Sequence, residues 1–119
     1  MKFLMLIKHE ESYRNQPIPQ GLLDAMGPFV TARMKSGAIT DTAGLKPSSD
    51  GFRVRSNGGK LKVTDGPFTE TKELVGGYAM AELGSREEAL QLAKEFMDLH
   101  RIHWPEFDGT CEVRPLEDM

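Results

Sequence analysis

The chain has 119 residues, which fits one domain spanning residues 1–119 and leaves little room for a second. Its net charge of −3 comes from 15 Lys and Arg against 18 Asp and Glu, which argues against a general affinity for DNA or RNA. One cysteine, Cys111, forms no intrachain disulfide and holds no cysteine-rich zinc site. No apolar run reaches the ~18 residues of a membrane span, and the N-terminus lacks a signal-peptide pattern, so we expect a cytoplasmic protein.

The first third of the chain predicts a strand and a helix. Residues Lys2 to His9 carry apolar side chains on both faces of an alternating pattern, which is typical of a central strand. A helical stripe of apolar residues runs from Leu22 to Met34. Pro28 interrupts it, so the helix either kinks there or has its main part starting there. Gly37 lies where a left-handed helix cap is expected.

The middle of the chain predicts further strands. Ile39 to Leu45 is expected to form one of them. Asn57-Gly58 separates two alternating segments and is typical of the tight turn in a β-hairpin. Thr64 to Glu73 is expected to be a polar connection. Val75 to Leu83 predicts another strand, in which Gly76-Gly77 indicates a bulge or a close backbone approach.

The last third predicts a helix and a final strand. Ser85 and Glu88 form a capping box, with the serine at the N-cap and the glutamate three residues later. The helix is expected to end at or before Trp104, because a proline follows. Thr110 to Leu116 predicts the last strand, with Cys111 as a small core residue.

The order strand, helix, strand, hairpin, strand, helix, strand predicts an α+β fold of the ferredoxin-like split βαβ type with a hairpin insertion. Two helices cover only one face of such a sheet, yet the first strand is apolar on both faces. A second copy of the chain is the simplest cover for the other face. We therefore expect a homodimer whose sheets face each other and enclose a cavity.

The three histidines are the first candidates for chemistry. His9 ends the first strand, where it is suited to bind a ligand in a cavity or to form a structural hydrogen bond at the sheet rim. His100 and His103 share a helix face, and this spacing allows metal chelation with His9 as a third ligand. The spacing alone is a weak pattern, and helix C-termini favour histidines for electrostatic reasons. We expect neither a metal nor another cofactor.

Two charged segments have a structural and a functional interpretation. Asp65 opens a turn-forming sequence, Asp-Gly-Pro-Phe, which is favoured as a turn but also holds a carboxylate at a strand end. A basic row lies on the hairpin. Solvation and protection of an exposed edge is its favoured role, with binding of an anion or nucleic acid as the alternative. The row consists of Arg53, Arg55, Lys60 and Lys62.

Residues 63–78, with the sequence VTDGPFTETKELVGGY, closely resemble the signature of the DGPF-domain proteins within the YCII-related superfamily. Residues 2–7 and 111–116 resemble the same proteins. The resemblance implies a ferredoxin-like dimeric α+β barrel. Some YCII-like relatives resemble muconolactone-isomerase-type enzymes and dehalogenating hydrolases, which are thought to pair an aspartate with a histidine on the first helix. Residues 20–36 contain no histidine, and Met26 takes about that place.

We therefore hypothesise that the protein binds a small polar or acidic molecule in a pocket at the dimer sheet. If it is an enzyme, hydrolase-type or isomerase-type proton transfer fits best, with His9 as general acid or base and Asp65 orienting it or binding substrate. His100 and His103 then add polarity at the pocket edge, and Arg114 holds a carboxylate. The alternative is a non-catalytic accessory or regulatory protein, because DGPF proteins are often encoded beside extracytoplasmic-function sigma factors.

Overall fold

The structure is a computed structural model that describes residues 1–10, 16–68 and 73–117. Residues 69–72 of the expected polar connection lie outside the described part. In that part, neither helix is long and apolar enough to cross a membrane. The elements in chain order are β1 (Lys2–His9), α1 (Gln20–Ser36), β2 (Ile39–Gly44), the 3₁₀ helix η2 (Ser48–Asp50), β3 (Phe52–Asn57), β4 (Lys60–Asp65), β5 (Leu74–Glu82), α2 (Arg86–His103) and β6 (Gly109–Pro115).

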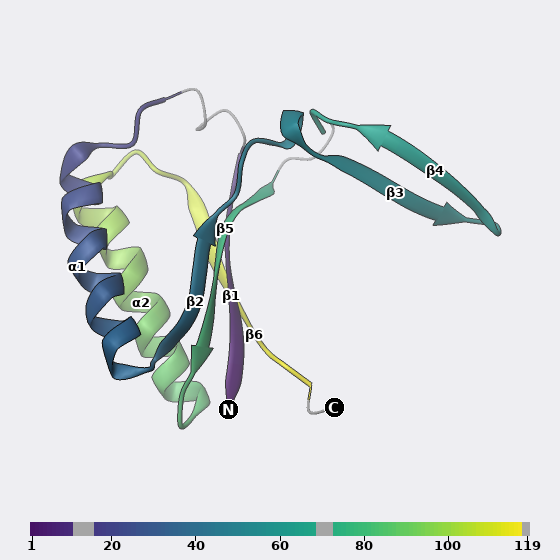
Figure 1. The fold of residues 1–119 in the computed structure, drawn as a ribbon. Coiled ribbons are helices and arrows are strands. Elements are labelled where there is room, and N and C mark those ends of the chain that lie inside the picture. The colour runs from purple at the N-terminus through teal and green to yellow at the C-terminus, as the bar shows by residue number, and fades with distance from the viewer. Residues whose placement is uncertain (11–15, 69–72, 118–119) are drawn as a thin grey trace.

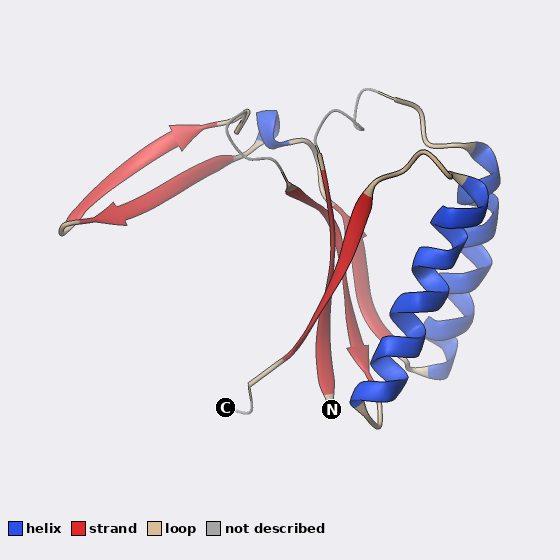
Figure 2. Ribbon diagram, turned by 180° about the vertical axis from the view of Figure 1, so that it is seen from behind, coloured by secondary structure: helices blue, strands red, loops and turns tan. Residues whose placement is uncertain are grey.

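The main sheet is antiparallel and has the strand order β2-β5-β1-β6, so the first strand lies inside the sheet as expected. This topology confirms the α+β class and is compatible with the ferredoxin-like pattern. Strands β3 and β4 pair only with each other and project from one end of the sheet, on the side away from the helices (Figures 1 and 2). The hairpin is therefore an insertion between β2 and β5.

Both helices pack on the same face of the main sheet (Figures 1 and 2). The odd-numbered residues of β1 face them, because successive side chains of a strand alternate between faces. Phe3 and Met5 are opposite Ala81 and Ala79 of β5, and all four belong to the packed core or line its edge. The buried core cluster consists of Phe3, Met5, Ile39, Ala81, Ala89 and Leu92.

In the described part of the chain, no helix or strand packs over the other face of the sheet (Figure 1). The even-numbered residues of β1 lie on it, with Leu4 opposite Met80 and Leu6 opposite Tyr78. These four side chains are only partly buried. The face thus keeps the apolar character that the sequence predicted, without a covering layer from its own chain.

Helix α1 runs without a break through Pro28, so the expectation of a main helix starting at that proline is wrong. The helix begins at Gln20, two turns earlier, and loses only the hydrogen bond that the proline has no N–H to donate. Gly37 ends it with φ 85° and ψ 0°, the left-handed cap that was expected. This cap turns the chain directly into β2.

Helix α2 begins and ends as predicted. The backbone N–H of Glu88 donates to Oγ of Ser85 over 3.2 Å, and the Glu88 carboxylate accepts from the N–H of Gly84 over 2.7 Å. These two bonds satisfy N–H groups that have no partner within the helix. Trp104 follows the last helical residue, and its N–H donates to the carbonyl of His100 over 2.7 Å.

The hairpin turn lies one residue later than the sequence predicted. Asn57 pairs with Lys60, so the two turn residues are Gly58 and Gly59, with φ 59° and 78°. A two-residue turn with two positive φ angles matches the right-handed twist of the strands, and a glycine pair adopts it more easily than Asn-Gly. The shift also extends β4 to Asp65, which was expected in the connection.

Candidate functional site

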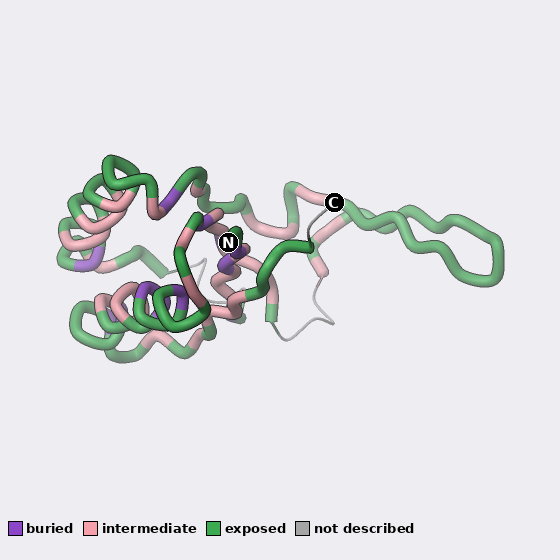
Figure 3. The backbone as a smooth tube through the Cα atoms, turned by 90° about the horizontal axis from the view of Figure 1, so that it is seen from below, coloured by how far each residue is buried: buried purple, intermediate pink, exposed green. Residues whose placement is uncertain are grey.

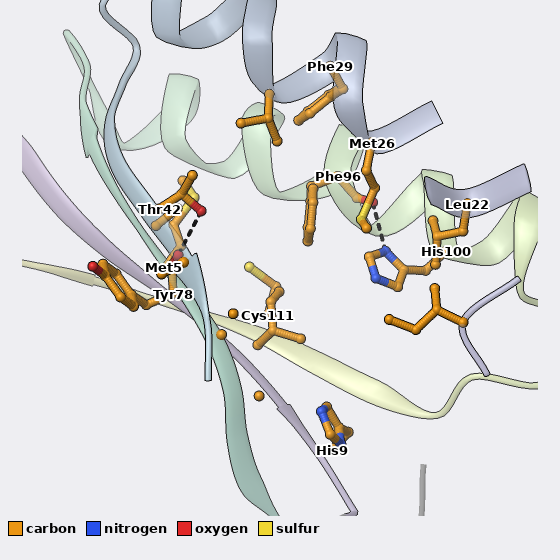
Figure 4. Close-up of a pocket in the computed structure, with 18 of the residues that line it drawn as sticks. Met5, His9, Leu22, Met26, Phe29, Thr42, Tyr78, Phe96, His100 and Cys111 are labelled. Atoms are coloured by element: carbon orange, nitrogen blue, oxygen red, sulfur yellow. Dashed lines mark hydrogen bonds between the residues drawn. The ribbon is translucent and has the colours of Figure 1, made fainter. Parts of the chain in front are cut away.

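A cavity of about 440 Å³ lies between the helix-covered face of the main sheet and the two helices (Figure 4). Its volume falls within the range of roughly 300–1,000 Å³ that is usual for small-molecule sites. Residues of β1, of both helices and of the connection from α2 to β6 line it, among them His9, His100 and Phe107. It is separated by the sheet from the uncovered face on which a partner was expected.

The lining of this cavity is mostly apolar and rich in aromatic rings. No Lys, Arg, Asp or Glu among the described residues lines it, so its polar character rests on a few side chains, chiefly two histidines. An apolar wall with a few placed polar groups is typical of sites for small organic molecules. The apolar and aromatic lining includes Ile18, Leu22, Met26, Phe29, Val30, Leu92, Phe96, Trp104 and Phe107.

His9 reaches the cavity from the sheet. It is buried at the end of β1, with 9% of its surface exposed. Its Nδ1 lies 2.8 Å from the carbonyl oxygen of Glu10. Because a carbonyl only accepts, Nδ1 carries the hydrogen in this contact, and Nε2 is the acceptor of the neutral ring. The contact with Glu10 fits the structural role predicted for His9 at the sheet rim, and its ligand-binding role stays a prediction.

A bulge in β5 makes room for the His9 ring. Ile7 pairs with Gly77 and Lys8 with Val75, so Gly76 is the extra residue. A Cβ atom on Gly76 would overlap the imidazole of His9. Both the bulge and the close approach that Gly76-Gly77 indicated are confirmed here. The group that lies close to Gly76 is the imidazole of His9, a candidate site residue.

His100 reaches the cavity from the opposite wall, on α2 (Figure 4). Its Nδ1 donates to the carbonyl of Phe96 over 3.1 Å, so the neutral ring has its acceptor at Nε2, on the cavity side (Figure 4). Burial lowers the pKa of His100, and the hydrogen bond to Phe96 opposes this effect only in part. At neutral pH the cavity therefore contains a neutral imidazole whose Nε2 is able to accept a hydrogen bond.

Phe107 connects the two histidines. Its ring centroid lies 5.9 Å from that of His9 and 5.0 Å from that of His100. The indole of Trp104 lies 5.1 Å from Phe107, and Phe96 lies 4.9 Å from His100. Ring contacts at these distances hold aromatic side chains in fixed orientations. The cavity end that carries the imidazoles is thus a packed aromatic cluster.

Sequence reasoning missed these aromatic residues as a site. Phe96 was assigned only to an apolar helix stripe, and Phe107 lay in a segment with no predicted element. The available signal was their spacing, because Phe96 and His100 are one helical turn apart and Trp104 ends the same helix. Cys111 also lines the cavity, and burial raises the pKa of its thiol, which agrees with the expected core role.

The other predicted site residues lie outside this cavity. Asp65 is exposed at the end of β4, opposite Phe52. His103 is exposed at the last residue of α2, near Gly21 of α1. Arg114 lies on the uncovered face, with Nη1 3.5 Å from the carboxylate of Glu112. In the described ranges, no three His, Cys, Asp or Glu side chains are placed to hold a metal ion.

The Asp65–Phe68 segment fastens the base of the hairpin. The N–H of Gly66 donates to the carbonyl of Gly51 over 2.9 Å, and the N–H of Phe68 donates to Oγ of Ser48 over 3.0 Å. Gly66 packs so closely on the Ser48 carbonyl that a Cβ atom would overlap it. The guanidinium of Arg53 lies 3.8 Å from the centre of the Phe68 ring. The structural interpretation of this segment as a turn fits these contacts.

One known family matches most of the chain. A family model described as the YCII-related domain matches residues 1–96. The chain belongs to the YCII-related family. A curated relative is "Uncharacterized protein R00369" of Rhizobium meliloti (strain 1021), which is 32% identical to this YCII-related chain over 83 residues. The match covers 70% of this chain and 63% of the relative, so it spans less than two thirds of that protein's length.

Proposed function

We propose that this YCII-related protein binds a small organic molecule in the cavity between its helices and its sheet. The observation that carries the proposal is the pair of buried imidazoles, His9 and His100, on opposite walls of an otherwise apolar cavity. The lining favours a ligand with a flat apolar body, because aromatic rings make up much of the wall. A polar or acidic group on that ligand then meets the histidine end.

The polar group of the ligand is best matched by a hydrogen-bond donor such as a hydroxyl. The neutral His100 offers Nε2 as an acceptor, because its Nδ1 already donates to Phe96. A fully charged carboxylate is a poorer match, because no cationic side chain among the described residues lines the cavity. Arg114, which was expected to hold a carboxylate, is on the other face of the sheet.

Proton transfer is the reaction class that this cavity supports, if the bound molecule is converted. A neutral imidazole accepts a proton from a bound hydroxyl or an acidic C–H group and returns it to another atom. His9 and His100 line the cavity from the sheet and from α2, so a ligand held between these walls lies between two imidazoles. His9 is oriented by the Glu10 carbonyl, and Asp65 lies outside the cavity.

The test uses three bicyclic probes of similar shape: 2-naphthol, 2-methoxynaphthalene and 2-naphthoate. Trp104 is the single tryptophan of the chain and lines the cavity, so quenching of its fluorescence reports binding. We expect 2-naphthol to bind about tenfold more tightly than 2-methoxynaphthalene, since one hydrogen bond is worth about 1–1.5 kcal/mol. 2-Naphthoate should bind more weakly than 2-naphthol.

Two phenylalanine variants assign the effect to a residue. His100→Phe removes the acceptor but keeps a ring, so the preference for 2-naphthol should disappear. His103→Phe makes the same chemical change on an exposed residue of the same helix, and the preference should remain. Equal binding of 2-naphthol and 2-methoxynaphthalene to the wild type would contradict the hydrogen-bond assignment. Absence of any quenching by all three probes at millimolar concentration would contradict the binding proposal.

We further propose that a second copy covers the open face of the sheet, giving the dimeric barrel that the DGPF resemblance implies. Its support is the apolar, partly buried character of a face that has no cover, which is formed by Leu4, Leu6, Tyr78 and Met80.

An accessory role beside an extracytoplasmic-function sigma factor is the second candidate function. The exposed hairpin favours this candidate, because a projecting apolar surface suits a protein partner.

A further inference from the structure

The hairpin of β3 and β4 exposes apolar side chains to an unusual degree. Phe52 is 68% exposed, Val54 55%, Leu61 75% and Val63 64%. Every residue of both strands is exposed (Figure 3). A two-stranded hairpin without a packing partner is marginally stable in water. These side chains therefore lack the burial that would stabilise the strands that carry them.

The hairpin has one apolar face and one basic face. Val54 is opposite Val63, with Phe52 and Leu61 on the same face at the neighbouring positions of this register. The other face pairs Arg55 with Lys62 and also carries the remaining two basic residues of the row. Such alternation is typical of a sheet that is packed on one side and wet on the other. The apolar face of the hairpin therefore needs a surface to pack against.

The direction of the hairpin is fixed at its base. The Asp65–Phe68 segment is held to η2 by the bonds to Gly51 and Ser48 described above. From this base the hairpin extends away from the helices, on the side of the uncovered sheet face (Figures 1 and 2). Any body that covers the sheet face therefore lies beside the hairpin. The hairpin and the uncovered sheet face thus border one common space (Figures 1 and 2).

The solvent-accessible area of the chain indicates how large an interface covers the sheet face and the hairpin. The folded chain exposes 8355 Å². A monomeric protein of 13.3 kDa exposes about 6,450 Å² according to the usual scaling with mass. The excess of about 1,900 Å² exceeds the ~800 Å² per partner of a standard interface and falls in the range of obligate dimers. The radius of gyration of 16.0 Å also exceeds the ~13.5 Å expected for 119 residues.

We propose that the hairpin is an arm that lays its apolar face on a second copy of this chain. A two-fold pair is self-complementary, so each copy gives one arm and receives one, and each sheet face covers the other. A second copy also accounts for the size of the area excess, which lies in the range that obligate dimers bury. The basic row remains in solvent and keeps the arm from pairing with further strands. This inference is independent of what the cavity binds.

The test measures the dimer dissociation constant by sedimentation and light scattering over a dilution series. The double variant Leu61→Ser/Val63→Ser removes apolar side chains from β4, and we expect it to raise the dissociation constant at least a hundredfold. Lys60→Ser/Lys62→Ser changes the same number of residues on the other face of the same strand. That control should change the constant less than fivefold. Trp104 fluorescence verifies that each variant is folded, since the arm is remote from the core.

Hydrogen exchange gives a second measurement. In the dimer the amide protons of residues 52–65 should be protected, and dilution below the dissociation constant should remove this protection. A wild type that stays monomeric at 100 μM would overturn the proposal and point to a different partner. A dimer whose dissociation constant is the same in both double variants and the wild type would overturn the role of the arm. Equal weakening by both double variants would overturn the assignment to the apolar face.

Discussion

Gly76 lies directly against the imidazole of His9, at the point where β5 bulges away from β1. The ring takes the space that a side chain at position 76 would need. Because the bulge and the ring are in contact, the glycine determines where Nε2 of His9 lies in the cavity. Gly76, which has no side chain, thus determines the position of the His9 imidazole.

Replacement of Gly76 by alanine should displace His9. We expect the variant to lose about 1–3 kcal/mol of unfolding free energy, the usual cost of overpacking a close contact. The measurement is urea denaturation followed by Trp104 fluorescence. Gly44→Ala is the control, because a Cβ atom there meets nothing within 4 Å although Gly44 also lines the cavity. Equal losses in the two variants would show that the His9 contact does not matter.

The stability of the protein should fall as the pH drops through the range in which His100 titrates in the unfolded chain. That range begins near pH 6.5, and burial places the pKa of the folded His100 below it. Between the two pKa values the unfolded state binds a proton that the native state does not, which favours unfolding. The contribution is at most about 1.4 kcal/mol per pH unit.

Denaturation curves at pH 8.0, 6.5 and 5.5 measure this effect. His100→Gln should flatten the pH dependence over this range, since the variant has no proton to bind at this position. His103→Gln removes a histidine that is exposed on the same helix, and its curves should follow those of the wild type. If His100→Gln keeps the full pH dependence, another group is responsible.

Truncation of Phe107 should loosen the histidine end of the cavity. Phe107→Ala removes ring contacts to His9, His100 and Trp104 at once. The expected loss is about 2–4 kcal/mol, slightly less than for a fully buried phenylalanine because Phe107 is only half-buried. Thermal unfolding measures it. Leu90→Ala, a truncation on the exposed side of α2, should cost well under half as much.

Loss of the Ser85 hydroxyl should destabilise the protein through the N-terminus of α2. Ser85→Ala leaves the N–H of Glu88 without its acceptor, which costs about 1 kcal/mol. Urea denaturation gives the value, and Ser49→Ala in the exposed η2 turn is the matched control. Ser85→Thr should recover most of the loss, because threonine also caps helices. A threonine variant as unstable as the alanine variant would argue against the cap.

Replacement of Gly66 by alanine should redirect the arm. The added methyl group would overlap the Ser48 carbonyl, so the base of the hairpin must shift. If the arm docks on a second copy, the dimer dissociation constant should rise at least tenfold although the apolar face is intact. Gly51→Ala is the control in the same base, because its Cβ atom would make an ordinary contact of 3.6 Å. An unchanged dimer in Gly66→Ala would show that the direction of the arm is not set there.

Local patterns in the sequence predicted the elements well, because each depends on residues near in the chain. The Ser85 cap, the Gly37 cap and the alternation in β1 concern single turns or single strands, and the structure confirms them. The observed hairpin turn lies one residue later than the predicted one, because Asn57-Gly58 and Gly58-Gly59 are both good turn sequences. Only the pairing of the strands selects between them.

The sequence by itself determined the α+β class, the strand that lies inside the sheet and the apolar character of both its faces. Tertiary structure decided which polar residues share a space. His9 and His100 are 91 positions apart and meet at one cavity because β1 and α2 pack together, whereas Asp65 and Arg114 were carried to other surfaces by the hairpin and by the face alternation of β6. A local pattern assigns a side chain to a face of its own strand or helix, but the distance between two faces is set by long-range packing.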